Sequence, residues 1–318
     1  MKREKVLITG GTGFIGSNLI FRLFSRYSCH LLIREESNLW RLKTVSNKIK
    51  IYKIDYFNTQ KLEALVKKIN PDYIIHLGSY GGSSDQENLE TIVKTNIQFT
   101  VNLLTATKNL NYKAFLNTGS SSEYGFKKKP MKETDFLEPN SFYSATKASA
   151  TYISKVFAEH FNKPIVTIRP FSVYGPFESP NRFIPTIIKN LILKKEIKLT
   201  PGKIRRDFIY VDDLIDGYVA LMKKAKKFKG KVFNLGTGKE YTNMEIVQEL
   251  FKVTNSKVPV KKGSFKKRNW DTEHWSADLN LVKSELGWQP RVSVREGLLK
   301  TYEWFLKNPK ILALYNEK

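Results

Sequence analysis

The chain has 318 residues, enough for one large domain or two closely joined ones. Its single cysteine, Cys29, excludes an intrachain disulfide framework, and its four scattered histidines show no ligand spacing, so we infer no metal site. The formal net charge is +24, but the lysines are spread along the chain without a zinc-finger or aromatic RNA-binding motif, so we expect no nucleic-acid partner.

The first residues contain no signal-peptide core, and no apolar run is long enough to cross a bilayer. We therefore expect a cytoplasmic protein without a membrane partner. A basic protein of this kind would still attract a small anion that carries two phosphates.

Strand and helix patterns alternate through the first half of the chain. Apolar runs predict strands at 6–9, 30–33, 49–54, 73–77, 115–118 and 165–169, with helices at 58–69 and 91–110 among those between them. Such alternation indicates right-handed βαβ units and a parallel sheet that is covered on both faces. The second half is less regular. It contains one more strand pattern at 232–236, and Thr242 and Glu245 have the spacing of a capping box that opens a helix.

A glycine-rich turn joins the first predicted strand to the first helix. Gly10, Gly13 and Gly16 follow a Gly-x-x-Gly-x-x-Gly spacing. Glycines let the backbone approach a pyrophosphate closely, and a helix start offers free N–H groups to the anion. A plain glycine turn has the same residues, but the strand–turn–helix context favours a dinucleotide site.

Tyr143 and Lys147 stand four residues apart, so on a helix they share one face. A neighbouring ammonium stabilises a phenolate and lowers the pKa of the phenol, which then exchanges protons near neutral pH. Such a pair is also common on solvated helix faces. The other motifs of the chain decide between these interpretations.

Taken in order, these motifs resemble those of the extended short-chain dehydrogenase/reductase family of nucleotide-sugar epimerases, dehydratases and reductases. The resemblance covers nearly the whole chain. Its landmarks are Thr9-Gly-Gly-Thr-Gly-Phe-Ile-Gly16, Asp55, His76-Leu-Gly78, Asn96, Thr118-Gly-Ser-Ser-Ser-Glu-Tyr-Gly125, Tyr143-x-x-x-Lys147, Arg169-Pro-Phe-Ser-Val-Tyr-Gly-Pro176, Arg205-Arg-Asp-Phe-Ile-Tyr-Val-Asp-Asp213 and Asn234-Leu-Gly-Thr-Gly238.

The resemblance implies an α/β fold, a Rossmann doubly wound parallel sheet with a smaller C-terminal α/β substrate-binding domain. It places the NAD(P)-binding domain at 1–170, with 205–238 returning to it, and the nucleotide-sugar-binding domain at 171–204 and 239–318. The implied catalytic residues are Ser120, Tyr143 and Lys147, of which Tyr143 is the acid/base and Lys147 also grips the nicotinamide ribose. The implied cofactor contacts are Gly10, Gly13, Phe14, Ile15, Gly16, Arg34, Asp55, Leu77, Asn96, Tyr143 and Lys147. The implied substrate contacts are Ser121, Ser122, Arg206 and Arg268.

Departures from the family pattern discriminate among the reactions. Family 4,6-dehydratases carry an acidic residue directly after the catalytic Ser or Thr, whereas this chain has Ser121 and Ser122, and Glu123 stands one position later, where the family usually has an apolar residue. Serines serve poorly as the acid and base that elimination of water needs, so dehydration is disfavoured.

Arg34, at the end of the second predicted strand, suits the 2′-phosphate of NADP(H), although it could equally be a solvent-facing loop residue, and Glu35 or Glu36 could still bind the ribose of NAD. We favour NADP(H) and hence net reduction, with NAD possible. Stretches such as Gly78-Ser-Tyr-Gly-Gly82 also look like the CDP-paratose and CDP-abequose synthase branch. The resulting expectation is an NADPH-dependent reductase of the C4 keto group of a nucleoside-diphosphate deoxysugar, CDP-linked by that likeness. The alternatives are an NAD-dependent C4 epimerase and a non-catalytic regulator that senses NADP.

Relatives in this family commonly form dimers through two helices of each subunit. We therefore expect a homodimer through helices near 96–108 and 143–161, with apolar faces from Val101, Leu104, Ile153, Val156 and Phe157, unless these are ordinary core residues. The loops after Gly78 and Pro176 are expected to shape the sugar pocket. Trp270 and Trp275 either join that pocket or pack the smaller domain.

Overall fold

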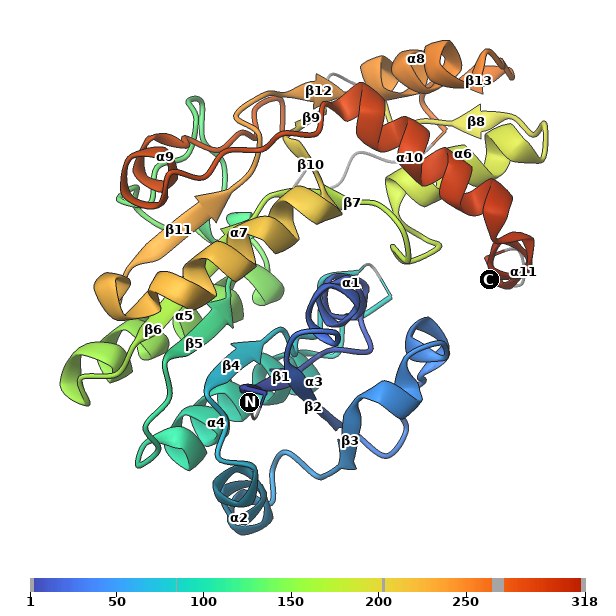
Figure 1. Ribbon diagram of the computed structural model, residues 1–318. Coiled ribbons are helices and arrows are strands. Elements are labelled where there is room, and N and C mark those ends of the chain that lie inside the picture. The colour runs from blue at the N-terminus through green and yellow to red at the C-terminus, as the bar shows by residue number, and fades with distance from the viewer. Residues whose placement is uncertain (1–2, 84, 202–203, 265–271, 316–318) are drawn as a thin grey trace.

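We describe the protein from a computed structural model, which defines residues 3–83, 85–201, 204–264 and 272–315 (Figure 1). A seven-stranded sheet with every neighbouring pair parallel forms its centre, in the order β11–β6–β5–β4–β1–β2–β3. The strands are β1 (Lys5–Thr9), β2 (Ser28–Ile33), β3 (Lys50–Lys53), β4 (Tyr73–His76), β5 (Ala114–Thr118), β6 (Ile165–Pro170) and β11 (Val232–Leu235). All seven predicted strands are confirmed, with ends that differ by one or two residues.

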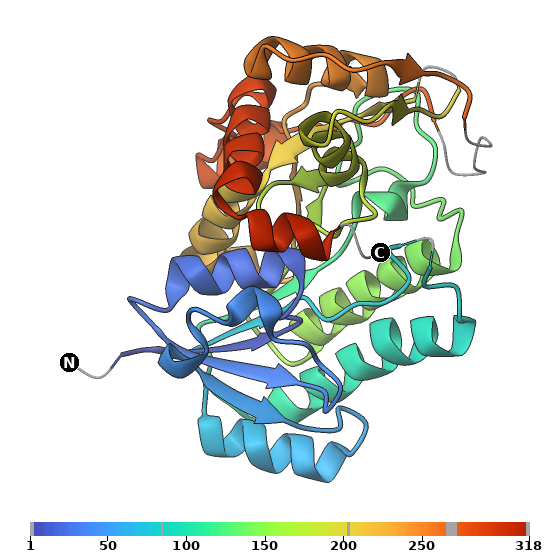
Figure 2. The same ribbon diagram turned by 90° about the vertical axis from the view of Figure 1, so that its right-hand side faces the viewer.

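Helices cover both faces of the sheet, as the sequence predicts. On one face α1 (Phe14–Leu23) and α7 (Val211–Lys224) pack through side chains such as Leu19 and Leu214. On the other face lie α2 (Thr59–Ile69), α4 (Phe99–Thr107) and α5 (Phe142–His160), in a second apolar cluster with Leu7 and Ile74 (Figures 1 and 2). Strand residues are therefore buried on both sides, which explains their near-continuous apolar runs. This is the Rossmann-like α/β architecture expected from the sequence.

The single helix predicted over 91–110 is interrupted in the structure. The chain forms α3 (Leu89–Val93), then a wider π-helical turn, η3 (Lys94–Gln98), and then α4. Asn96 lies in the wide turn and is buried. Its side-chain amide binds both backbone groups of Tyr80 and the hydroxyl of Thr146. This local widening accompanies a tertiary contact that helical periodicity alone does not reveal.

The remaining elements gather beyond one end of the sheet, as Figures 1 and 2 show. The helices of this outer part are α6 (Phe183–Ile192), α8 (Asn243–Thr254), α9 (Asn280–Leu286), α10 (Val294–Lys307) and α11 (Pro309–Leu314). The strand pairs of this outer part are β7 (Ser172–Tyr174) with β10 (Phe208–Tyr210), β9 (Arg205–Arg206) with β12 (Tyr241–Thr242), and β8 (Ile197–Lys198) with β13 (Val260–Lys261). The predicted capping box opens α8, because Thr242 and Glu245 exchange backbone-to-side-chain hydrogen bonds of 3.1 and 2.6 Å.

The short helical turns are η1 (Trp40–Leu42), η2 (Ser46–Lys48), η4 (Ser121–Tyr124) and η5 (Ala225–Phe228). Within the described ranges, no helix has both the length and the apolar character needed to span a membrane. The division of the chain into two domains stays a prediction. Strand β11 joins the central sheet beside β6, after the chain has formed the outer pair β7 and β10.

Candidate active site

A cleft of about 2070 Å³ lies where the carboxyl ends of the central strands face the outer elements. It is lined by residues that follow β1, β2, β3, β4 and β5 and by residues of α5, α6, β8 and β9. Ordinary ligand pockets have roughly 300–1,000 Å³. The cleft therefore has room for two ligands side by side, such as a dinucleotide and a second nucleotide-linked group. In open α/β sheets this edge is the usual ligand site.

The glycine turn forms one wall of the cleft. Gly10 has a φ of +67°, and a Cβ atom there would lie 2.6 Å from the carbonyl carbon of Leu77. At Gly16 a Cβ atom would lie 2.4 Å from the carbonyl oxygen of Gly10. The N-terminus of α1 receives no side-chain cap, so its first N–H groups are available to an anion. Residues 10, 13, 14, 15 and 16 all line the cleft, and their contact with a cofactor stays a prediction.

The predicted contacts at the next strand ends also line the cleft. Arg34 follows β2, and its Nε atom lies 3.1 Å from a carboxylate oxygen of Glu36, with both side chains more than half exposed. Asp55 follows β3 and accepts the backbone N–H of Phe57 at 2.9 Å. Leu77 follows β4 at the same edge. Asn96 differs from these residues. It is buried behind Tyr80 and does not line the cleft, so it would support cofactor binding indirectly.

Tyr143 and Lys147 lie on the first two turns of α5, which begins at a cap formed by Ser141 and Ser144. Both side chains line the cleft. The amine of Lys147 donates a hydrogen bond to the carbonyl oxygen of Thr118, at the end of β5. Burial lowers the pKa of Lys147 to about 8, against the opposing effect of the Glu123 carboxylate.

The expected lowering of the Tyr143 pKa is wrong for this structure. Burial raises the pKa of Tyr143, while a hydrogen bond with Ser120 and the charge of Arg182 act in the lowering direction. The groups that act on the Tyr143 pKa are thus Ser120, Arg182 and Glu123, while the amine of Lys147 is bound to the Thr118 carbonyl. Four-residue spacing places two side chains on one face but does not decide which atoms they bind.

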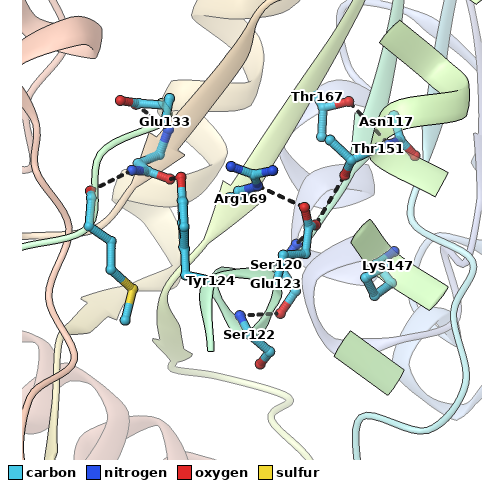
Figure 3. A network of polar contacts seen from close by, with 12 residues as sticks. Asn117, Ser120, Ser122, Glu123, Tyr124, Glu133, Lys147, Thr151, Thr167 and Arg169 are labelled. Carbon is cyan, nitrogen blue, oxygen red and sulfur yellow. Dashed lines mark hydrogen bonds and ion pairs between the residues drawn. The ribbon is translucent and has the colours of Figure 1, made fainter. Parts of the chain in front are cut away.

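Ser120 begins the short helical turn η4 directly after β5. Its Oγ atom accepts the N–H of Ser122 at 3.1 Å, and its own N–H donates to Glu123 Oε1 at 2.7 Å. The Glu123 side chain points away from the cleft and into a buried network that includes Arg169 (Figure 3). The segment after β5 and helix α5 thus bring Ser120, Tyr143 and Lys147 together at the cleft, and their catalytic roles stay a prediction.

Two of the predicted substrate contacts, Ser121 and Arg206, meet at the indole of Trp275. Trp275 Nε1 donates to Ser121 Oγ at 3.0 Å, and the Arg206 guanidinium lies 4.9 Å from the centre of the indole ring. Ser121, Ser122, Arg206 and Trp275 all line the cleft. Trp275 therefore belongs to the pocket and also packs, because it is 7% exposed. The predicted contact Arg268, together with Trp270, lies outside the described residues.

Arg182 and Glu178 line the cleft, and the sequence analysis named their loop but not these two residues. Arg182, just before α6, donates to the carbonyl oxygen of Gly82 at 3.0 Å, and Gly82 lies against the ring of Tyr143. Burial raises the pKa of Glu178 to about 8, with Arg182 opposing that shift. Both residues stand in the loop after Pro176, which together with the loop after Gly78 lines the cleft. No spacing rule links these two loops, so only the folded chain reveals their contact.

Comparison with known proteins shows the family to which the chain belongs. Residues 6–236 match the model of the NAD dependent epimerase/dehydratase family, so the chain belongs to this family. It is 30% identical over 319 residues to a UDP-glucuronate 4-epimerase of Thermodesulfobacterium geofontis, covering 96% of this chain and 97% of that protein. It is 27% identical over 332 residues to the human dTDP-D-glucose 4,6-dehydratase, covering 96% and 91% of the two chains.

A solved structure of an epimerase is also similar to this chain. A UDP-glucuronic acid 4-epimerase of Bacillus cereus, in complex with UDP-glucuronic acid and NAD, is 28% identical and has a TM-score of 0.85, with 95% and 99% of the chains covered. The family inferred from the motifs is confirmed. The narrower likeness to CDP-paratose and CDP-abequose synthases is not supported by these relatives, which are epimerases and a dehydratase.

Proposed function

We propose that the protein is an NAD-dependent C4 epimerase of a nucleoside-diphosphate sugar. The carrying observation is that Ser120, Tyr143 and Lys147 converge on one cleft beside the glycine turn. The epimerases among the relatives favour this function over the keto-reduction expected from the sequence. Epimerisation leaves the cofactor in its original redox state, and the cleft is large enough to hold cofactor and sugar nucleotide together, as any direct hydride transfer requires.

The residues present fit a nicotinamide dinucleotide. Gly10 and Gly16 leave space that a Cβ atom would fill, and the uncapped start of α1 would hold the pyrophosphate. Asp55 and Leu77 would lie along the adenosine half. We assign the cofactor to residues 1–170 and 205–238 and the sugar nucleotide to residues 171–204 and 239–318, with Arg206 near its diphosphate.

The reaction needs a base that becomes an acid in the second half of the cycle. A nicotinamide dinucleotide, when bound, would supply reversible hydride transfer at sugar C4, and the cleft would have to let the 4-keto sugar rotate so that hydride reaches the opposite face of that carbon. Tyr143, as phenolate, would take the proton of the C4 hydroxyl and give it back to the C4 oxygen. Ser120 would hydrogen-bond that oxygen throughout. Lys147 would hold the ribose, and the positive ring of the bound nicotinamide would stabilise the phenolate.

Dehydration remains disfavoured although dehydratases are among the relatives. Elimination needs an acid for the departing hydroxyl, and the two residues after Ser120 are serines. The nearest carboxylate in sequence, Glu123, is fully buried and bound to Arg169, so it does not reach the cleft.

A second candidate, reduction of a 4-keto sugar by NADPH, rests on Arg34. This residue stands at the end of β2, where a guanidinium would suit a 2′-phosphate. Its ion pair with Glu36 at 3.1 Å weakens that argument, because a phosphate would have to compete with a carboxylate already present.

The test is to incubate the protein with a panel of UDP-, dTDP- and CDP-linked hexoses that carry deuterium at C4. We expect an epimeric nucleotide sugar that retains its deuterium at C4 and no net formation of reduced cofactor, with NAD preferred over NADP. NMR spectroscopy of the separated products gives both the configuration and the label. Tyr143→Phe is the control for contaminating activity.

A different outcome would replace the proposal with the second candidate. If no hexose is epimerised but a 4-keto sugar consumes NADPH and receives label from deuterated cofactor, the protein is a reductase. Arg34→Asp would then weaken NADPH binding.

A further inference from the structure

A buried ion pair lies directly beneath the candidate catalytic serine. The side chains of Glu123 and Arg169 are 0% and 3% exposed, and Arg169 Nε lies 2.8 Å from Glu123 Oε2. Neither residue lines the cleft. Glu123 comes from the turn η4 and Arg169 from β6, so the pair joins the catalytic loop to the central sheet (Figure 3).

The other oxygen of the carboxylate holds the catalytic loop itself. Glu123 Oε1 accepts the backbone N–H of Ser120 at 2.7 Å and the hydroxyl of Thr151 at 3.1 Å. It also packs so closely on Gly119 that a Cβ atom there would lie 2.5 Å away from it. The backbone between β5 and η4 is therefore fitted to this carboxylate.

Lys147 binds the same stretch of backbone. Its amine donates to the carbonyl of Thr118, one residue before Gly119. The segment Thr118–Ser120 thus lies between an ammonium and a carboxylate. Burial lowers the pKa of Lys147 to about 8, and Glu123 is the charged group that opposes this shift. Glu123 also acts to raise the pKa of Tyr143.

We propose that Glu123, with Arg169 as its counter-ion, is a positioning residue whose carboxylate fixes the backbone of Ser120 and whose charge stabilises the ammonium of Lys147. The proposal rests on the proposed function in taking Ser120, Tyr143 and Lys147 as the reacting groups. A carboxylate that lies outside the cleft thereby influences the protonation of two residues that line it, Lys147 and Tyr143.

Packing alone does not require charges at this place. A buried ion pair contributes little net stability relative to apolar residues of similar volume. Arg169 is held by Glu123 and by the ring of Tyr124, 4.6 Å from its guanidinium, and Arg169 Nη1 is buried without a hydrogen-bond partner in the described part of the chain. Because one nitrogen of Arg169 lacks a hydrogen bond, a gain in folding stability poorly explains why these two charges are buried here.

The other titratable groups around this segment come from the elements packed against it. His76 on β4 is buried between two threonine hydroxyls, and burial lowers its pKa to about 3, so it stays neutral. Tyr218 on α7 bonds the Thr118 hydroxyl and stays protonated, because burial raises its pKa. Arg182 acts on Tyr143 from the loop before α6. Glu123 is therefore the anion that acts on Lys147.

The experiment compares Glu123→Gln with the parent protein, because glutamine keeps the shape and can still accept the Ser120 N–H. In protein labelled with ¹³C at the lysine Cε, the signal of Lys147 is identified by its loss in Lys147→Arg. We expect this signal to titrate at a pH at least about half a unit lower in Glu123→Gln, since a nearby opposite charge favours the ammonium. The pH profile of any turnover should shift in the same direction, because Tyr143 loses the same negative neighbour.

Asp213→Asn is the matched control. Asp213 on α7 is a buried carboxylate that accepts the N–H groups of Arg291 and Val292 at 3.0 and 2.9 Å and does not line the cleft. This variant should lose stability without moving the Lys147 titration. If Glu123→Gln does not fold, the double change Glu123→Gln with Arg169→Met removes both charges and should still lower the titration.

An unchanged Lys147 titration in a folded variant overturns the proposal, as does an equal shift in Asp213→Asn. The titration requires neither cofactor nor turnover. Failure of the proposed epimerase activity would therefore leave this result standing by itself.

Discussion

Among single residues, Tyr143 can act as a base only if its surroundings lower its pKa enough for the phenol to ionise near neutral pH. Burial raises its pKa, and the hydrogen bond with Ser120 and the charge of Arg182 only partly oppose that effect. A phenol that titrates near 10 in water needs additional positive charge to ionise near neutral pH. The positive ring of an oxidised nicotinamide would supply such charge, so we expect ionisation of Tyr143 to depend on the bound cofactor.

Replacing Tyr143 with phenylalanine tests this role directly. The variant should bind NAD with unchanged affinity but lose about 10²- to 10⁴-fold in kcat, the usual contribution of a positioned acid/base. Calorimetric titration with NAD and steady-state kinetics measure the two quantities. Tyr302→Phe is a control with the same chemical change, since Tyr302 lies on α10 and does not line the cleft. Wild-type kcat in Tyr143→Phe would refute the assignment.

At the scale of elements, the site depends on contacts between segments distant in the sequence. The loop after β5 meets the segment before α9 through Ser121 and Trp275, 154 residues apart, and β9 adds the guanidinium of Arg206 over the same indole. The indole N–H needs a partner because Trp275 is buried, and its ring face suits a guanidinium. Trp275 thus links the catalytic loop to the expected diphosphate contact.

A double-mutant cycle with Ser121→Ala and Trp275→Phe measures this link. Phenylalanine keeps a ring beneath Arg206 but removes the N–H, so we expect a coupling of about 1 kcal/mol in the free energy of unfolding. Urea denaturation gives the four values. Trp275→Leu, which also removes the stacked ring, should raise the KM for the nucleotide sugar more than Trp275→Phe does. Strict additivity of the two changes would show that the hydrogen bond contributes nothing.

In the molecule as a whole, the adjacent helices α3 and α5 carry exposed apolar side chains. Leu89 and Val93 on α3 are 45% and 41% exposed, and Tyr152 and Val156 on the adjacent α5 are 55% and 62% exposed. Of the residues expected at a dimer interface, Leu104 belongs to the core instead, because it is fully buried in the α2–α4–α5 cluster. A cluster of exposed apolar side chains on two helices is typical of an interface. We propose that it forms the homodimer.

Light scattering coupled to size-exclusion chromatography tests the dimer. We expect twice the chain's mass for the parent protein. The dissociation constant of the dimer should rise at least about 100-fold in Val156→Glu, because a two-fold interface buries the new charge twice. Phe136→Glu is the control, since Phe136 is 89% exposed outside α3 and α5 and should leave the dimer intact. A parent protein that is monomeric at micromolar concentration would contradict the proposal.

The alternating strands and helices, the parallel sheet, the glycine turn and the motif residues at the strand ends were all predictable from the amino-acid sequence. These follow from local periodicity and backbone freedom, which neighbouring residues fix. Tertiary structure decided the rest: the wide turn at Asn96, the placement of Arg182 against the loop over Tyr143, the enclosure of Ser121 by Trp275, and the burial of Glu123 with Arg169 behind Ser120. Each of these depends on which side chains meet after the chain has folded, and burial then sets their charge and hydrogen bonding in ways that spacing along the chain does not encode.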